Sequence, residues 1–237
     1  MRIEVLFPEI CNLYGDLFNV EFLKRSCPEI EIINTSLKSE PLFATEKPDM
    51  IYMGSTTERG QELAAEKLYS YRNRFLELIE DNALILMTGN AIELFGTYIE
   101  LENEKQIRCL DILPSIAIRQ MMKRYNSLYI GKFADNIVVG FKSQFSHSYG
   151  DNSDCYLLET IKGAGINPNV KNEGFKINNL FCTYLIGPVL PLNPPFAKYI
   201  LELMGIHDPV LLFEQECYDS YYERVKEFKV PGKEFES

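Results

Sequence analysis

The sequence has little histidine and no closely spaced cysteines. Its 237 residues include two histidines and six cysteines. The cysteines lie far apart, without a Cys-x-x-Cys pair, at positions 11, 27, 109, 155, 182 and 217. Zinc sites draw several Cys and His ligands from short spacings, so a zinc cluster is excluded and neither a metal nor a cofactor is expected. We interpret the cysteines as free thiols in a reducing cytoplasm.

Positive charge is also scarce. The chain has 24 Lys and Arg against 34 Asp and Glu, a formal net charge of -10. Such a chain repels nucleic acid phosphates and anionic lipids, so we expect neither nucleic acid nor membrane as a partner. No apolar run approaches membrane-spanning length, and the chain begins with strand-like residues 2–7 instead of a signal peptide. We therefore expect a soluble, cytoplasmic protein.

What the chain does contain is an alternation of buried strand-like segments with amphipathic helical segments. Strands are predicted at residues 2–7, 30–34, 50–53, 83–87 and 180–185, and helices at residues 16–25, 61–79 and 195–204. This order is typical of an α/β fold with a mostly parallel sheet and ligands at the carboxyl ends of its strands. We predict one domain, residues 1–237, with closing helices in 206–230 and a mobile tail at 231–237.

The middle of the chain has a different pattern, with shorter β-branched and aromatic segments. Residues 107–112, 127–133 and 137–141 are predicted to form an antiparallel extension of the sheet. Residues 154–162 are predicted to be helical.

The turn between residues 83–87 and 91–95 carries the clearest functional signal. The first segment reads as a fully buried strand and the second as a helix, with only Thr88, Gly89 and Asn90 between them. In α/β enzymes such a turn presents a nucleophile above the sheet edge, next to free N–H groups of the helix. Gly89 accepts the positive φ of that position but has no side chain with which to attack a substrate.

Four segments in fixed order carry a resemblance to a known family. They are residues 12–16 (Asn-Leu-Tyr-Gly-Asp), 54–61 (Gly-Ser-Thr-Thr-Glu-Arg-Gly-Gln), the turn at Gly89, and 182–194 (Cys-Thr-Tyr-Leu-Ile-Gly-Pro-Val-Leu-Pro-Leu-Asn-Pro). Together they resemble the class I glutamine amidotransferases of the cobyric acid synthase type, and most of all the stand-alone subunits that supply ammonia for amidating lipid II in peptidoglycan synthesis. The resemblance covers residues 1–204 and implies a flavodoxin-like three-layer fold.

The two positions that the family uses for catalysis carry other residues here. Matching Glu93-Leu94-Phe95-Gly96 to the family's Gln-Leu-Leu-Gly places its nucleophilic cysteine on Gly89, and matching residues 183–188 places its catalytic histidine on Ile186. Thiolate attack and proton transfer by an imidazole need the missing groups. Cys182 is the candidate for a relocated nucleophile, although it lies one strand pitch further from the turn.

Other matched positions concern substrate binding. Ser55 and Thr56 replace glycines in a loop whose backbone N–H groups face the reaction's oxyanion in the family. The added Cβ atoms crowd the approach, although these donors could persist. Asn90 is a further candidate in the turn. Arg124 matches an arginine that holds the glutamine carboxylate, with an ordinary surface arginine as the alternative.

Three polar residues near these motifs have simpler interpretations. Asp16 is interpreted as the N-cap of the helix that it precedes. Glu93 is interpreted as a helix-surface residue. His147, which matches a non-catalytic histidine of the family, is interpreted as a polar loop residue.

These substitutions leave three hypotheses. The first, which we favour, is a catalytically degenerate protein that binds or regulates a partner; the second is an active glutaminase with Cys182 as relocated nucleophile, supplying ammonia for amidation of a peptidoglycan precursor or of cobyric acid. The third is a receptor for glutamine or another amino acid. Because the sequence lacks a Gly-x-x-x-x-Gly-Lys-Ser/Thr loop for ATP, a synthetase partner would be a separate, Mur-ligase-like chain.

Overall fold

The computed structural model describes residues 1–233 and 235. Its centre is a six-stranded sheet in the order β13-β14-β4-β3-β1-β2, in which every neighbouring pair is parallel except β13 with β14. The strands are β1 (Arg2–Leu6), β2 (Glu31–Thr35), β3 (Met50–Met53), β4 (Leu84–Thr88), β13 (Phe175–Ile177) and β14 (Leu180–Thr183). The predicted α/β fold with a mostly parallel sheet is confirmed.

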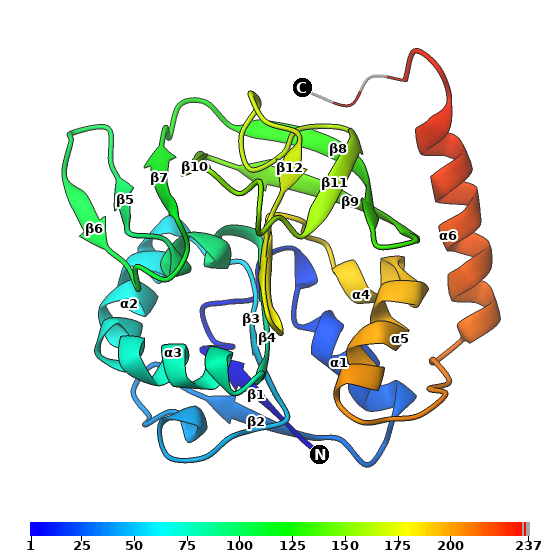
Figure 1. Ribbon diagram of the computed structural model, residues 1–237, viewed down its shortest axis with the longest axis horizontal. Helices are drawn as coiled ribbons and strands as arrows, with labels where there is room; N and C mark the ends of the chain where they lie inside the picture. Colours follow the sequence, from blue (N-terminus) through cyan, green and yellow to red (C-terminus); the bar gives the residue numbers. More distant parts are fainter. Residues whose placement is uncertain (234, 236–237) are drawn as a thin grey trace.

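Helices cover both faces of this sheet, which gives the three layers expected. Figure 1 shows α2 and α3 on one side of the strands, and α1, α4 and α5 on the other. The helices are α1 (Phe18–Ser26), α2 (Glu58–Leu68), α3 (Arg72–Glu80), α4 (Val189–Leu192), α5 (Pro194–Leu203) and α6 (Glu214–Lys229), with short 3-10 helices η1 (Leu13–Gly15), η2 (Leu42–Ala44), η3 (Tyr69–Tyr71) and η4 (Gly89–Phe95). The helix predicted at 61–79 is thus divided by η3.

Side chains of β4 alternate between two hydrophobic cores. Met87 packs in the core that contains Phe75 of α3, whereas Leu86 packs in the core that contains Ile200 of α5. All five residues of β4 are buried. A strand covered on both faces needs apolar side chains throughout, which explains the continuous hydrophobic run in the sequence.

Two further four-stranded sheets lie beyond the carboxyl ends of the central strands, in the upper part of Figure 1. One has the order β10-β7-β5-β6 and the other β12-β11-β8-β9. Their strands are β5 (Tyr98–Glu100), β6 (Gln106–Arg108), β7 (Ser115–Arg119), β8 (Tyr125–Phe133), β9 (Asn136–Gln144), β10 (Ser146–Gly150), β11 (Leu158–Lys162) and β12 (Asn172–Glu173). The middle segments of the chain therefore pair with each other, and the antiparallel addition to the central sheet is β13.

The helix predicted at residues 154–162 is wrong. Leu158 to Lys162 form strand β11, because Glu159 and Thr160 pair with β8. Its partly exposed residues contain too few apolar side chains for a clear period of two, so the tertiary partner decides the conformation.

The closing region contains one long helix, α6, rather than two. The tail predicted to be mobile contacts the body: the Phe235 carbonyl accepts the Leu128 N–H at 2.7 Å, and the Phe235 ring packs on Phe228. Residues 234, 236 and 237 of that tail lie outside the described residues.

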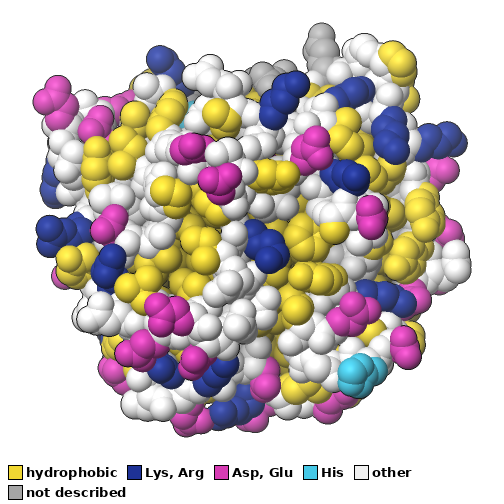
Figure 2. Space-filling model, in the orientation of Figure 1, with side chains coloured by type: hydrophobic (Ala, Val, Ile, Leu, Met, Phe, Trp, Pro, Cys, Tyr) yellow, Lys and Arg dark blue, Asp and Glu magenta, His cyan; other side chains and the backbone are white. Residues whose placement is uncertain are grey.

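Charges are mixed on the surface. On the face drawn in Figure 2, Lys and Arg side chains alternate with Asp and Glu side chains instead of gathering in one patch. None of the described helices is both long and apolar enough to cross a membrane.

Candidate functional site

The predicted tight turn exists, and it brings together the two positions that the resemblance assigns to nucleophile and base. Gly89 follows β4 directly and has φ +61°, with the 3-10 helix η4 in place of the α-helix expected. Ile186 lies just beyond β14, the neighbour of β4. A Cβ atom built on Gly89 would lie only 2.9 Å from Ile186 Cγ2.

The turn also touches the loop after β3. The same Cβ atom on Gly89 would lie 2.5 Å from Ser55 Cβ, far inside the contact distance of two carbon atoms. Ser55 and Ile186 therefore occupy the space that any side chain at position 89 would need. Glycine fits this position for two reasons: its positive φ and the absence of room.

These residues line a cavity of about 310 Å³, a size suited to a small molecule. The cavity contains five of the predicted residues: Ser55, Gly89, Asn90, Arg124 and Ile186. Sequence reasoning missed the other lining residues, which are Leu13, Tyr14, Thr57, Glu58, Ser143, Gln144, Phe145, Ser146 and Tyr184. Most of them come from η1 and from the β9–β10 connection, whose approach to the turn no local motif signals.

Thr56 and Cys182 are placed differently from the cavity-lining candidates. Thr56 is buried, and its Oγ1 donates to the Ile10 carbonyl at 2.6 Å. Cys182 is fully buried in the hydrophobic core beside Met87 and Phe175. Burial, helped by the negative charge of Glu173, raises the pKa of the Cys182 thiol well above its ordinary value, so the thiolate form is suppressed.

The two backbone donors expected to face an oxyanion already have acceptors inside the protein. The Ser55 N–H donates to Asp16 Oδ2 at 2.9 Å, and the Thr56 N–H donates to Asn90 Oδ1 at 2.9 Å. Asn90 completes a two-point clamp, because its Nδ2 donates to the Thr56 carbonyl at 2.8 Å. A substrate oxygen would have to displace these bonds in order to use either donor.

Asp16 does not cap a helix, so the N-cap interpretation is wrong. Helix α1 begins at Phe18, and its N-cap residue is Leu17. The Asp16 carboxylate is fully buried and instead joins three loops: besides Ser55, it accepts the Thr88 hydroxyl at 3.0 Å and the Gly187 N–H at 3.1 Å. Burial raises the pKa of the Asp16 carboxyl, and these hydrogen bonds partly oppose the shift.

Glu93 is not on the helix surface either. It is buried behind the cavity, where it accepts the hydroxyls of Ser146 and Tyr184 and an N–H of Gln61 at 2.9 Å. Arg119 donates to Gln61 Oε1 at 2.6 Å, which extends the network. Burial raises the pKa of the Glu93 carboxyl. The short, irregular η4 turns this side chain inward, where an α-helix would have changed its direction.

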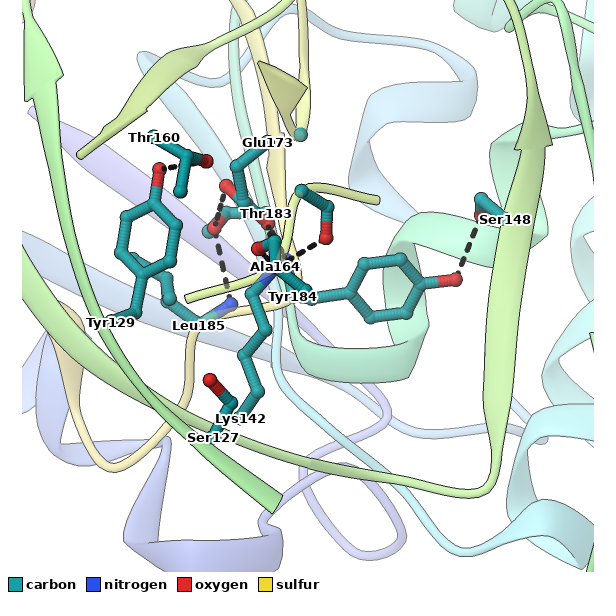
Figure 3. A network of polar contacts seen from close by, with 12 residues as sticks. Ser127, Tyr129, Lys142, Ser148, Thr160, Ala164, Glu173, Thr183, Tyr184 and Leu185 are labelled. Carbon is teal, nitrogen blue, oxygen red and sulfur yellow. Dashed lines mark hydrogen bonds and ion pairs between the residues drawn. The ribbon is translucent and has the colours of Figure 1, made fainter. Parts of the chain in front are cut away.

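A buried ion pair that the sequence did not reveal supports the wall of the cavity (Figure 3). Lys142 Nζ lies 3.4 Å from Glu173 Oε1 and donates to the carbonyls of Ala164 and Gly165 at 2.9 and 2.7 Å. Its ammonium lies between the rings of Tyr129 and Tyr184. Burial lowers the pKa of Lys142, and the charge of Glu173 opposes this.

Glu173 links that ion pair to the strand that leads to Ile186. Its Oε1 accepts the Tyr184 N–H at 2.9 Å, and its Oε2 accepts the Thr183 hydroxyl at 2.9 Å. The buried pair therefore fixes the end of β14 and, with it, one side of the cavity.

Two charged side chains of opposite sign stand at the cavity rim. The Arg124 guanidinium lies 4.5 Å from the centre of the Phe145 ring, and Glu58 begins helix α2. Neither forms an ion pair with any residue in the described part of the chain. The rim can thus hold a ligand that carries both charges.

His147 lies beside the cavity-lining segment on β10. Gln144 Nε2 lies 3.2 Å from its Nδ1, and its ring packs edge-on against Tyr125. Burial, with the nearby positive charge of Lys142, lowers the pKa of His147 to about 4. The imidazole is therefore neutral at pH 7. Across residues 1–233 and 235, no group of His, Cys, Asp and Glu is arranged to hold a metal ion.

Sequence relatives agree with the motifs. The chain is 25% identical over 193 residues to the lipid II isoglutaminyl synthase (glutamine-hydrolyzing) subunit GatD of Staphylococcus aureus (strain N315), an alignment that covers 81% of this chain and 79% of that protein. It is 22% identical over 207 residues to the subunit of the same name from Streptococcus pneumoniae (strain ATCC BAA-255 / R6), covering 83% and 77%.

Solved structures show the same fold. A crystal structure of a glutamine amidotransferase matches with a TM-score of 0.57 at 13% identity, covering 86% of this chain and 99% of that one. The glutaminase domain of Trypanosoma brucei CTPS with bound acivicin matches with a TM-score of 0.52 at 12% identity, covering 90% and 96%. Residues 2–193 match the model of the CobB/CobQ-like glutamine amidotransferase domain. With the fold, the turn at Gly89 and this match over most of its length, the chain belongs to the CobB/CobQ-like glutamine amidotransferase family.

Proposed function

We propose that this amidotransferase-like chain has no glutaminase activity and acts as a binding or regulatory protein. The observation that carries the proposal is the surroundings of Gly89. The residue has no side chain, and Ser55 and Ile186 fill the space that a nucleophile would need. The site has therefore been packed around the absence of a nucleophile.

The chemistry of carboxamide hydrolysis supports the same conclusion. The reaction needs a nucleophile, a group that transfers protons, and donors for the oxyanion. Here Gly89 and Ile186 stand at the first two positions, and the N–H groups of Ser55 and Thr56 are bonded to Asp16 and Asn90. Losing nucleophile and base together removes most of the acceleration, and the paired donors leave little of the remainder.

A relocated nucleophile is the alternative, and Cys182 is its candidate. The burial of this thiol in the core and its raised pKa oppose that role, because attack on a carboxamide needs an accessible thiolate. Treatment with 6-diazo-5-oxo-L-norleucine, followed by peptide mapping, tests the alternative. We expect no labelled cysteine, and labelling of Cys182 would support an active enzyme instead.

The direct test is a glutaminase assay on the pure chain, with the Cys182→Ala variant beside it. We expect ammonia release at the background rate for both proteins. Release above background by the parent chain that disappears in Cys182→Ala would refute the proposal.

The ligand we propose for the cavity is an amino acid. Arg124 would bind its carboxylate, and Glu58 would bind its ammonium group, because both side chains line the cavity without an ion pair of their own in the described residues. Gln144, also in the cavity wall, has a buried Oε1 without a hydrogen-bond partner among the described residues. An ammonium group is the type of donor that this oxygen lacks.

We further propose a synthetase of the Mur-ligase type as partner. The support is that both relatives carry the name of a subunit of a synthase. Co-expression with a Mur-ligase-like protein of the same genome, followed by light scattering on the purified sample, tests this. We expect a particle with the summed mass, and separate elution of the two chains would contradict the proposal.

A further inference from the structure

The floor of the cavity differs in chemistry from its rim. We define the floor by its five deeply buried lining residues: Ser55, Gly89, Ser146, Tyr184 and Ile186. The rim carries the charges of Arg124 and Glu58, whereas the floor carries no charged side chain. A ligand held by its charged groups at the rim would direct its side chain towards this floor.

Every hydroxyl of the floor donates its proton to the protein. Ser55 Oγ donates to the Leu13 carbonyl at 3.0 Å, Tyr184 OH donates to Glu93 Oε1 at 3.0 Å, and Ser146 Oγ donates to the same carboxylate. The Ser55 N–H is bonded to Asp16. A carbonyl oxygen that reached the floor would find none of these donors free.

Hydrocarbon takes the place of those donors at the end of the cavity. Ile186 is 2% exposed and sits at the position next to Gly89 where a cysteine would otherwise lie. The lining at this point is the Ile186 side chain with the Cβ of Ser55, and neither group can donate a hydrogen bond.

From these contacts we propose that the cavity selects an α-amino acid with an aliphatic side chain and discriminates against glutamine. This inference rests on the proposed function, because it names the ligand class of the same cavity. Placing the glutamine carbonyl on the floor without a donor leaves a polar group unsatisfied, which weakens binding by about 5- to 150-fold. An aliphatic side chain of the same shape has no such group and gains from leaving water.

Two ligands of matched shape provide the test. L-Homoleucine has the shape of L-glutamine, with methyl groups in place of the carboxamide oxygen and nitrogen. Titration calorimetry on the full chain measures both dissociation constants. We expect homoleucine to bind about 5- to 150-fold more tightly than glutamine. Equal affinities, tighter binding of glutamine, or no heat from homoleucine at millimolar concentration would each overturn the inference.

Variants locate the binding and reverse the selectivity. Arg124→Met should abolish binding of both ligands, whereas Arg108→Met, which removes an arginine stacked on Tyr69 away from the cavity, should leave it unchanged. Ile186→Asn supplies an amide donor on the floor and should narrow the ratio of the two affinities. Its control is Ile161→Asn on β11, where the side chain is 49% exposed. Unchanged binding in Arg124→Met would overturn the inference.

The two proposals fail in different ways. Ammonia release from glutamine would refute the absence of glutaminase activity. A preference for glutamine without ammonia release would refute only the aliphatic selectivity.

Discussion

The buried carboxylate of Asp16 accepts the backbone N–H of Ser55 at 2.9 Å. The same side chain holds Thr88 at the end of β4 and the N–H of Gly187 beyond β14. One carboxylate therefore ties together the three loops that meet at Gly89.

Replacing Asp16 should loosen these loops together. Asp16→Asn keeps the volume but presents an NH2 group to at least one of three donors, so we expect a loss of about 1–3 kcal/mol in the free energy of unfolding. Hydrogen exchange should accelerate at Ser55 and Gly187 at the same time. Asp49→Asn is the control, because the exposed Asp49 accepts a single backbone N–H, from Arg2. Faster exchange at only one of the two loops would contradict the shared anchor.

A cysteine at position 89 should destabilise the protein before it reacts with anything. Gly89→Cys combines positive φ with overlap against Ser55 Cβ, and we expect a cost of about 2–4 kcal/mol. Gly205→Cys isolates the backbone contribution, because Gly205 has φ +90° and no atom near its Cβ position. Adding Ser55→Gly should recover the part due to overlap. Chemical denaturation measures all four proteins, and equal costs at positions 89 and 205 would show that the overlap is relieved without strain.

Removing the buried cation should be costly. Lys142→Met leaves Glu173 buried without its counter-charge, and we expect a loss of about 3–5 kcal/mol. The double variant Lys142→Met with Glu173→Gln should recover part of this loss. Lys198→Met breaks the half-exposed pair with Glu214 and should cost about 0–1 kcal/mol. Similar losses for Lys142→Met and Lys198→Met in thermal unfolding would contradict the role of burial.

Stability should depend on the protonation of His147. Its pKa of about 4 in the folded chain lies below the usual value of about 6.5, so the unfolded chain binds the proton more readily. The free energy of unfolding should therefore fall as pH decreases from about 6.5 to 4, by at most about 1.4 kcal/mol per unit. His147→Asn should flatten this part of the curve, whereas His207→Asn, at the other histidine, should not. A parallel slope in His147→Asn would show that other groups cause the effect.

The fold could be predicted from the sequence because each part of the signal is local. The apolar run at 83–87 has the composition of a strand buried on both faces, and residues 61–79 carry an amphipathic helical period. Residues 154–162 could not be assigned this way. Their conformation depends on pairing with β8, a strand about thirty residues earlier, and no local pattern encodes that partner.

The candidate site was predicted in part for the same reason. Ser55, Gly89 and Ile186 follow central strands, so parallel pairing alone brings them to one edge of the sheet. The burial of Asp16 and Glu93 was missed, because a carboxylate at a loop or helix looks the same in sequence whether it faces water or three distant donors. Only the tertiary structure supplies Gly187 to Asp16 and Tyr184 to Glu93.

The close packing of Ser55 and Ile186 over Gly89 also has an evolutionary consequence. A lineage that regained cysteine at this codon would meet steric overlap first, and the thiol would still lack an imidazole and open amide donors. Several substitutions would have to accumulate before selection could reward any of them, and the first would lower stability. The contact thus works as a ratchet that holds this pocket away from thiol chemistry.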